Sequence, residues 1–264
     1  MTVSRSPEDP PTQYLTVDGG TLAYDVRGSG PLVVLAHGMG DSREAYRFLV
    51  PALVGSGRRV VTVDLRGCGE SSVGWPSYTR TAIAGGAVTI AAAQAPALVT
   101  AVVELAPFTR AQQFSLGDLR TATYRRGMVA LLGAGVLGSV RQWKKYLELA
   151  YPGQRPADWD ARQARIEAML REPGRMKALT AMGQASPADA GEQLPSVTCP
   201  VLVVQGSADP DWVSPQAEGV AIVAALPDGL GRLEMIEGAG HYPHVQHPAE
   251  VVTAVRSFLD AVGA

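Results

Sequence analysis

Short runs of consecutive apolar residues, each followed by a stretch of different spacing, dominate the pattern of this sequence. Runs without alternation of polar and apolar residues are typical of strands buried on both faces of a parallel sheet. Strands that alternate with helices predict a sheet that helices cover on both sides. The predicted strands are residues 31–36, 59–65, 101–105, 201–205 and 232–236.

The segments around these strands complete the expected α/β fold. Residues 13–17 and 21–26 flank the tight turn Asp18-Gly19-Gly20 and predict a hairpin, which adds an antiparallel edge to a mostly parallel sheet. Apolar spacing predicts helices at 43–56, 87–94, 215–226 and 248–262.

Residues 109–197 break the alternation of strands and helices. They are rich in Arg, Gln, Leu and Ala at helical periods, with glycine and proline breaks. We therefore expect a core formed by residues 1–108 and 198–264, and a helical lid formed by residues 109–197.

Charge and cysteine content limit the possible partners. The chain has 264 residues, with 23 Lys and Arg against 25 Asp and Glu, so no basic excess is available to bind nucleic acid. The two cysteines, Cys68 and Cys199, form neither a disulfide framework nor a metal-binding spacing. Together with an N-terminal stretch that lacks a signal peptide, they predict a cytoplasmic protein.

One stretch imitates a membrane span, because residues 82–103 carry no charge. Gln94 and Pro96 interrupt it, and most of it is Ala and Gly, which transfer weakly into lipid. A buried helix followed by a buried strand explains the run better, so we expect no membrane partner.

Three clusters directly follow predicted strands, where open α/β sheets bind ligands. In residues 37–40, glycines beside His37 favour backbone N–H groups that hold an oxyanion, or a plain glycine turn with a structural histidine. In residues 206–211, Asp209 is an acid that orients an imidazole, or a turn aspartate. In residues 238–244, His241 is a candidate general base.

A metal site is an alternative interpretation of the third cluster, because His244 and His247 follow His241 at a spacing of three. No cysteine or carboxylate cluster accompanies these histidines in the sequence. We therefore expect no metal ligands here.

Together these clusters resemble the α/β-hydrolase family. The matching segments are His37-Gly38, residues 64–71, residues 206–209 and Gly240-His241, and the order of acid before histidine also fits. The resemblance covers about residues 14–261 and implies a helical lid at residues 109–197. It implies that Asp209 is the triad acid, that His241 is the general base and that Gly38 and Met39 form the oxyanion hole. It implies no cofactor.

The nucleophile of that family is missing from the sequence. The family carries its nucleophile in a Gly-x-Ser-x-Gly elbow between a strand and a helix. No such motif occurs in this chain, and the aligned position holds Ile83, which cannot attack a substrate. An aspartate nucleophile is absent from the expected site too.

The spacing around the expected elbow predicts a deletion. A helix, a strand and their loops need roughly 25 residues, whereas only residues 73–84 are available here. We interpret the chain as a family member that lacks a helix, the central strand and the nucleophile, with a junction near residues 84–86. The strands 31–36 and 101–105 must then pair directly, or another strand must fill the gap. Otherwise buried peptide groups stay unpaired, at about 1–3 kcal/mol each.

The resulting functional hypothesis is a hydrolase of a small apolar ester, epoxide or similar substrate, impaired or inactive because it lacks a nucleophile. Ser71, Ser72 and Cys68 are the candidate replacements. A non-catalytic ligand-binding or interaction protein is the alternative. The candidates to line a substrate pocket, or simply to pack the lid, are Phe114, Leu116, Trp143, Tyr146, Leu147 and Trp159.

A third hypothesis is a dinucleotide-binding enzyme. Residues 133–138 match the G-x-G-x-x-G pattern, and residues 128–132 could form the strand that must precede it. The pattern lies within the expected helical lid, however. A helix or a turn between helices is therefore the favoured interpretation.

Overall fold

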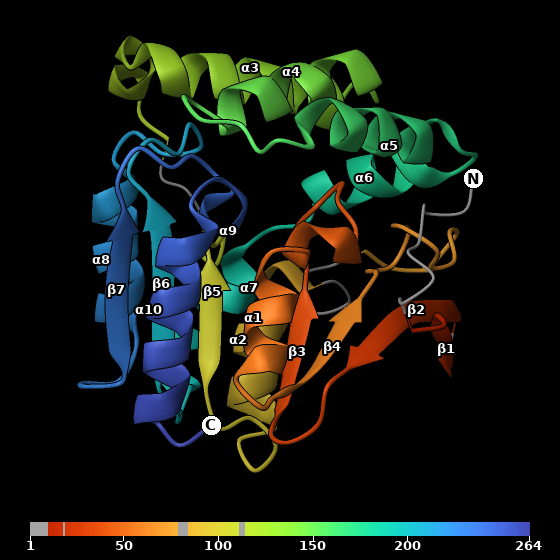
Figure 1. Cartoon of the computed structure of the whole chain (residues 1–264). Coiled ribbons are helices and arrows are strands. Elements are labelled where there is room, and N and C mark those ends of the chain that lie inside the picture. The colour runs from red at the N-terminus through yellow and green to blue at the C-terminus, as the bar shows by residue number, and fades with distance from the viewer. Residues whose placement is uncertain (1–9, 18, 79–83, 111–113) are drawn as a thin grey trace.

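Two separate sheets lie under a layer of helices in the computed structural model, which describes residues 10–17, 19–78, 84–110 and 114–264 (Figure 1). The first sheet has the order β1-β2-β4-β3 and the second the order β5-β6-β7. The strands are β1 (Gln13–Val17), β2 (Gly20–Arg27), β3 (Leu32–Ala36), β4 (Arg59–Val63), β5 (Val102–Leu105), β6 (Val201–Gly206) and β7 (Gly231–Ile236).

Strand direction agrees with the prediction of a mostly parallel fold. Strand β3 pairs in parallel with β4, and β6 pairs in parallel with both β5 and β7. Strand β2 is antiparallel to β1 and to β4, and thus forms the predicted hairpin edge. Every residue of β6 is buried, as expected for an apolar run between two strands and two layers of helices. The predicted α/β fold is confirmed.

Helices cover both faces of the sheets. Val50 of α1 (Leu49–Gly55) and Phe258 of α10 (Pro248–Ala261) share one apolar cluster. Ala92 of α2 (Ala84–Gln94) and Ile222 of α8 (Pro215–Ala225) share another. A short helix, α9 (Pro243–Gln246), precedes α10.

The predicted helix at residues 43–56 is interrupted. A 3-10 helix covers Arg43–Tyr46, and α1 begins only at Leu49. Pro51 explains the break, because it has no N–H to donate to the carbonyl four residues earlier and its ring crowds that carbonyl.

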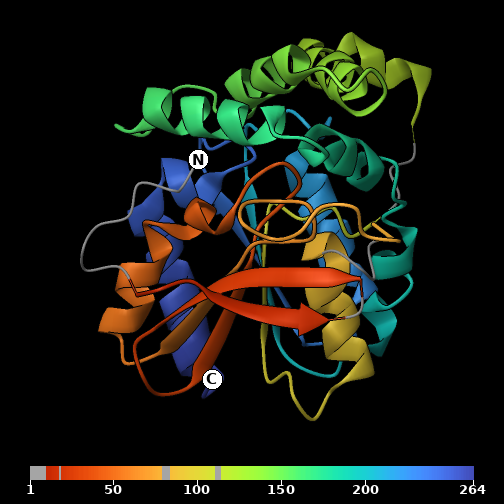
Figure 2. The same ribbon diagram turned by 90° about the vertical axis from the view of Figure 1, so that its right-hand side faces the viewer.

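Helices of residues 122–183 lie above the carboxyl ends of the strands (Figure 1, Figure 2), whereas residues 188–196 pack against α2 and α8; we call residues 109–197 the insertion below. Its apolar cluster includes Trp143 and Leu147 together with Tyr242 and Val245 of the core. Its α-helices are α3 (Ala122–Gly135), α4 (Val140–Ala150), α5 (Trp159–Arg171), α6 (Arg175–Gly183) and α7 (Ala188–Gly191), with 3-10 helices at Leu116–Arg120 and Leu194–Ser196.

The glycine pattern at residues 133–138 lies at the end of α3 and in the turn before α4. Residues 128–132 are helical, so the strand that a dinucleotide site requires is not present at this position. Among the described residues, no helix has the length and apolar composition needed to cross a membrane.

The two sheets do not join. Strand β3 pairs with β4 alone and β5 with β6 alone, and no strand of the described residues lies between β3 and β5. The predicted direct pairing of these strands is therefore absent, and no other described strand fills the gap. Residues 79–83, which include Ile83 and most of the predicted start of the missing helix, lie outside the described residues.

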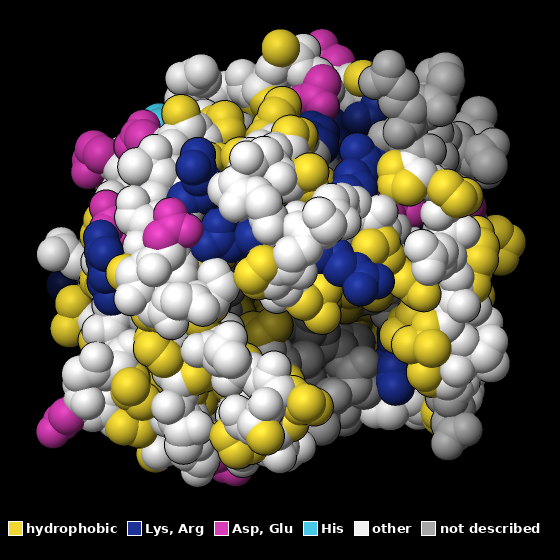
Figure 3. Space-filling view, turned by 60° about the horizontal axis from the view of Figure 1, so that its bottom comes forward, with side chains coloured by type: hydrophobic (Ala, Val, Ile, Leu, Met, Phe, Trp, Pro, Cys, Tyr) yellow, Lys and Arg dark blue, Asp and Glu magenta, His cyan; other side chains and the backbone are white. Residues whose placement is uncertain are grey.

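A cavity of about 850 Å³ lies between β3 and β5 and extends to the carboxyl ends of the strands. Its lining includes all of β3 and β5, together with residues of α1, α2 and α10, and we call this part of it the inter-sheet slot. Figure 3 views the molecule from the side of the amino ends of these strands and shows hydrophobic side chains spread over this face.

Candidate active site

The predicted acid and base lie against each other at the carboxyl ends of β6 and β7. Nδ1 of His241 is 3.0 Å from Oδ2 of Asp209. A second carboxylate, Oδ2 of Asp211, lies 3.1 Å from the same nitrogen. With Nδ1 engaged in this way, Nε2 is the ring nitrogen left for a reacting group, and His241 lines the large cavity.

Asp209 is held in place by its neighbours. Its side chain accepts hydrogen bonds from Nε2 of Gln205, at 2.9 Å, and from the backbone N–H of Asp211, at 3.0 Å. The side chain is fully buried. Because these donors fix both carboxylate oxygens, the acid meets the imidazole in a single orientation.

The histidine loop is anchored to the end of α4. The backbone N–H of His241 donates to the carbonyl of Ala150 at 3.0 Å. A Cβ on Gly240 would lie only 2.2 Å from that carbonyl oxygen, so this close approach requires glycine. The N–H of Gly240 donates to Oε1 of Gln246 at 2.8 Å. The insertion thus positions the histidine as directly as the sheet does.

Asp211 is a site residue that no motif in the sequence marks. It accepts a hydrogen bond of 2.6 Å from the phenol of Tyr146, which belongs to α4. The available signal was the presence of two carboxylates within three residues, but the family pattern marks only Asp209. The presence of Asp211 gives the imidazole two acidic neighbours.

The electrostatics favour a protonated histidine. Burial lowers the pKa of His241, but the carboxylates of Asp209 and Asp211 outweigh burial and raise it to about 9. Burial raises the pKa of Asp211 to about 7, partly opposed by His241. The group therefore stabilises an imidazolium, which is the form a general base reaches after it has taken a proton.

The predicted oxyanion loop faces the same cavity. Gly38 and Met39 line it together with His241. Gly40 has φ of +70°, and a Cβ there would lie 2.5 Å from the ring of Trp143. Glycine is therefore required where this loop meets the insertion.

His37 has the structural role that was the alternative interpretation of the first cluster. Its Nε2 accepts from the backbone N–H of Leu65 at 3.0 Å, so Nδ1 carries the proton and donates to the carbonyl of Gly38 at 2.6 Å. Burial lowers the pKa of this ring, against the opposing charges of Asp64 and Asp41. A neutral imidazole thus ties the loop to the end of β4.

The three candidate replacement nucleophiles serve the fold. Oγ of Ser71 donates to the carbonyl of Asp64 at 2.6 Å, and Oγ of Ser72 accepts from the N–H of Thr21 at 2.9 Å. Burial raises the pKa of Cys68 to about 12, so its thiol stays protonated. None of the three is among the described residues that line the cavity of His241.

Asp209, Asp211 and His241 are the described residues that could together hold a metal ion, since one ligand atom of each lies within 4.8 Å of the others. Their hydrogen bonds to one another, to Gln205 and to Tyr146 account for this grouping. His244 and His247, whose spacing offered an alternative metal site, lie in other surroundings. The ring of His244 stacks on Tyr46, and Nδ1 of His247 is 3.0 Å from Oε1 of Glu250.

The residues proposed to line a substrate pocket take different positions. Trp143 and Tyr146 line the large cavity. Leu147 is buried in the cluster of the insertion, and Trp159 packs against Tyr151. The two remaining residues, Phe114 and Leu116, are exposed.

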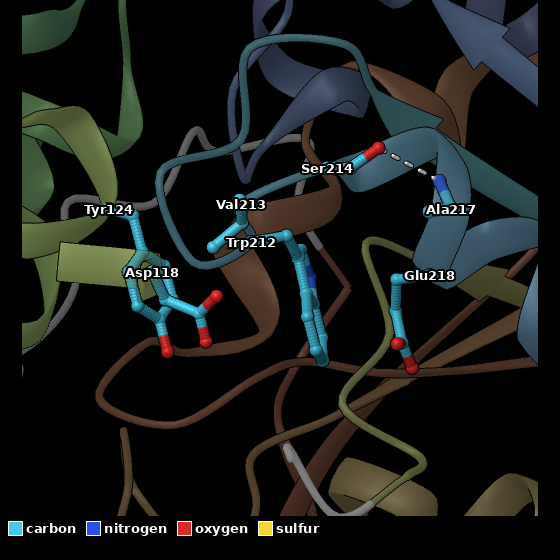
Figure 4. Close-up of a pocket in the computed structure, with 7 residues that line it drawn as sticks. All are labelled: Asp118, Tyr124, Trp212, Val213, Ser214, Ala217 and Glu218. Atoms are coloured by element: carbon cyan, nitrogen blue, oxygen red, sulfur yellow. Dashed lines mark hydrogen bonds between the residues drawn. The ribbon is translucent and has the colours of Figure 1, made fainter. Parts of the chain in front are cut away.

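A second, smaller pocket of about 250 Å³ lies near the site (Figure 4). The ring of Phe108 separates it from the histidine, with ring centroids 5.0 Å from Trp212 and 5.7 Å from His241. Its lining comprises Asp118, Tyr124, Trp212, Val213, Ser214, Ala217 and Glu218.

Comparison with known proteins places the chain among hydrolases. A family model described as "alpha/beta hydrolase fold" matches residues 31–84, and one described as "Alpha/beta hydrolase family" matches residues 84–254. The two matched segments meet at residue 84, within the junction inferred from the spacing.

Two curated relatives illustrate the similarity. A Mycobacterium tuberculosis H37Rv protein that carries the name non-heme bromoperoxidase BpoC is 31% identical over 268 aligned positions, with 92% of this chain and 99% of the relative covered. Since 92% of 264 residues is fewer than 268 positions, the relative has residues where this chain has none. Bifunctional epoxide hydrolase 2 of Rattus norvegicus is 40% identical over 73 residues, which are 27% of this chain and 13% of the relative.

A solved structure shows the same fold. An esterase from Thermogutta terrifontis superposes with a TM-score of 0.71 and 22% identity, covering 97% of this chain and 100% of the esterase. The family model that matches residues 84–254 and the relative aligned over nearly its whole length agree with this superposition. The chain therefore belongs to the α/β-hydrolase family.

Proposed function

We propose that this chain carries the acid–base half of a nucleophile–His–Asp hydrolase, with Asp209 as the acid and His241 as the base. The substrates of the complete mechanism would be small apolar esters, epoxides or similar compounds, bound under the insertion acting as a lid. The chain in this form is impaired or inactive, because the described residues bring no serine or cysteine nucleophile to His241.

One observation carries the proposal of impaired activity. No serine or cysteine is among the described residues that line the cavity containing His241. A nucleophile in this mechanism needs a hydrogen bond to the base that activates it. Thr109 also lines this cavity and directly follows Phe108, whose ring contacts His241. The hydroxyl of Thr109 has no hydrogen-bond partner in the structure.

The state of the histidine supports the same proposal. The carboxylates of Asp209 and Asp211 raise the pKa of His241 to about 9, which favours the protonated ring, and a protonated imidazole has to lose its proton before it can act as a base. In a complete triad the nucleophile would donate its proton to Nε2, and the two carboxylates would stabilise the ion pair that results. In this chain the two carboxylates stabilise the protonated ring of His241, but no nucleophile of the described residues is there to be activated.

The comparisons support a missing segment as the cause. The two family models meet at residue 84, where α2 begins, and a relative aligned over nearly its full length has residues without counterparts in this chain. The split between β3 and β5 is the structural consequence expected from the loss of a central strand.

The test is the intact mass of the folded protein after treatment with a fluorophosphonate serine probe, together with turnover of a chromogenic ester. We expect neither adduct nor turnover. His241→Ala is the control, because an adduct or turnover that disappears in this variant would prove that a substitute nucleophile exists. Peptide mapping with Thr109→Val as the matched variant would then show whether Thr109 is that nucleophile.

Non-catalytic ligand binding is the second candidate function, and the size of the cavity favours it. A volume of about 850 Å³ lies within the usual range of small-molecule sites. A rise in the melting temperature with decanoic acid or its methyl ester, without hydrolysis of the ester, would support this function. No rise with either compound would count against it.

A further inference from the structure

The inter-sheet slot exposes two strand edges that face one cavity. In the described part of the chain, β3 is bonded only to β4 and β5 only to β6, so each has one edge without a strand partner. Residues of both strands line the same cavity. The side chains of Leu32 and Val34 are 61% and 53% exposed, although they belong to a run typical of buried strands.

The hydrogen bonds of β3 and β5 identify the backbone groups that face the slot. The N–H of Arg59 in β4 donates to the carbonyl of Pro31, and the N–H of Val102 donates to the carbonyl of Pro200. Peptide groups of successive residues in a strand point to opposite edges. The backbone groups of Leu32 and Val34 in β3, and of Val103 and Leu105 in β5, therefore point away from their own sheets.

The slot opens at the carboxyl ends of its strands into the part of the cavity that contains His241, and most of its own wall is uncharged. The phenol of Tyr46 donates to the carbonyl of Ala36 at 2.6 Å and so completes the carboxyl end of β3. Among the described lining residues from β3, β5, α1, α2 and α10, the one ionisable side chain is Glu104. Burial raises its pKa to about 7, Thr89 donates to one of its oxygens, and the other oxygen has no partner.

We propose that the inter-sheet slot binds an extended, uncharged and mainly apolar segment of a separate polypeptide, about five residues long, as a strand between β3 and β5. The juxtaposition of two unpaired parallel edges across an apolar cavity carries this proposal. The proposal goes beyond the proposed hydrolase function, and no turnover is needed to test it.

Three properties of the slot favour a polypeptide over a hydrocarbon chain. A hydrocarbon leaves the peptide groups on both edges unpaired, whereas a strand bonds to both, and each buried unpaired group costs about 1–3 kcal/mol. A five-residue strand spans about 17 Å, which matches the five residues of β3. The uncharged walls match an uncharged segment, and Glu104 offers a spare acceptor to a polar side chain.

The probe for the test is a fluorescent peptide with the β6 sequence VLVVQ flanked by lysines, titrated with the full chain by fluorescence anisotropy. Two further peptides carry N-methyl groups on alternate residues, one on the odd and one on the even positions. A strand in the slot would donate the N–H groups of its odd residues to one of the strands β3 and β5, and those of its even residues to the other. Since each N-methylated peptide lacks one of these two sets of N–H groups, we expect each to bind at least about tenfold more weakly.

Each other outcome overturns the proposal. Weakening by one N-methylated set alone means addition to an ordinary single sheet edge. Equal binding of all three peptides means that apolar side chains merely fill the cavity, as a fatty acid would. If the unmodified peptide does not bind, the proposal is wrong.

A pair of variants locates the binding. Val34→Lys places a charge at the slot, and Leu15→Lys places one on β1, where the side chain is 52% exposed. Both positions are exposed, so both variants should fold, which circular dichroism checks. We expect Val34→Lys to weaken peptide binding about tenfold and Leu15→Lys to leave it unchanged. Equal effects of the two variants would place the peptide elsewhere.

Discussion

The phenol of Tyr146 donates a hydrogen bond of 2.6 Å to Oδ2 of Asp211, which joins α4 of the insertion to the acid–histidine group. Burial raises the pKa of Asp211, and this bond opposes the rise. We expect Tyr146→Phe to lower the free energy of unfolding by about 1–2 kcal/mol in urea titrations, because a buried carboxylate loses a donor. Tyr14→Phe, at a side chain that is 57% exposed, is the control. Equal stabilities of the two variants would contradict this role.

Glu104 makes the stability of the protein fall as pH rises. Burial raises its folded pKa from 4.5 to about 7, so the folded chain holds a proton that the unfolded chain has already lost. The stabilising contribution is present below about pH 4.5 and is lost as pH rises through 7. Glu104→Gln should remove a loss of up to about 3 kcal/mol between pH 5 and pH 8, as measured by urea unfolding.

Glu148→Gln is the matched control for this measurement, because Glu148 lies exposed on α4. It should keep the pH dependence of the unchanged chain. If Glu104→Gln keeps it as well, the carboxyl group of Glu104 is not the source.

His244 has the opposite effect on pH dependence. Its ring stacks on Tyr46, neither ring nitrogen has a hydrogen-bond partner, and burial lowers its pKa from 6.5 to about 4. The folded chain therefore binds fewer protons than the unfolded chain between these values, and stability is lost as pH falls from about 6.5 to about 4. We expect His244→Phe, which keeps an aromatic ring against Tyr46, to reduce this loss by up to about 3 kcal/mol.

Urea unfolding at pH 4.5 and pH 7 measures the difference. His247→Phe is the comparison, since His247 is only half-buried and lies beside Glu250. If His247→Phe reduces the pH dependence as much as His244→Phe does, His244 is not the source of the effect.

Gly40 and Gly57 separate backbone strain from crowding. Both have positive φ, +70° and +80°, but a Cβ on Gly40 meets Trp143 at 2.5 Å, whereas a Cβ on Gly57 meets nothing within 4 Å. Gly57→Ala should cost about 1 kcal/mol, from backbone strain alone. Gly40→Ala should cost about 1–3 kcal/mol more, because the oxyanion loop or Trp143 must move. Equal melting temperatures of the two variants would mean that the insertion moves to accommodate the added Cβ at Gly40 with no loss of stability.

The family pattern predicted the fold and the placement of two site residues. Asp209 and His241 each follow a strand, and parallel strands bring their carboxyl ends to one edge of a sheet, so their meeting at 3.0 Å follows from the order of elements. Asp211 and Tyr146 could not be paired in this way, because the bond between them depends on how α4 packs over the sheet. Their catalytic and positioning roles are for the tests above to decide.

The sequence alone did not determine what lies between β3 and β5. Spacing predicted that a central strand is missing, and it allowed β3 and β5 to pair, a substitute strand to enter, or peptide groups to stay unpaired. Local sequence cannot choose among these outcomes, because the choice depends on whether the layers around the strands can move together. Helices α1 and α10 on one face and α2 and α8 on the other share apolar clusters with the strands, and the two sheets stay apart between them.

The sequence by itself determined the alternation of strands and helices, the acid and the histidine at strand ends, and the lack of a nucleophile elbow, since periodicity and motif spacing are local properties. Only the tertiary structure decided that two carboxylates flank His241, that Cys68, Ser71 and Ser72 serve the fold, and that a cavity separates the sheets. Contacts between distant segments fix these features, because burial and hydrogen bonding depend on which elements pack together.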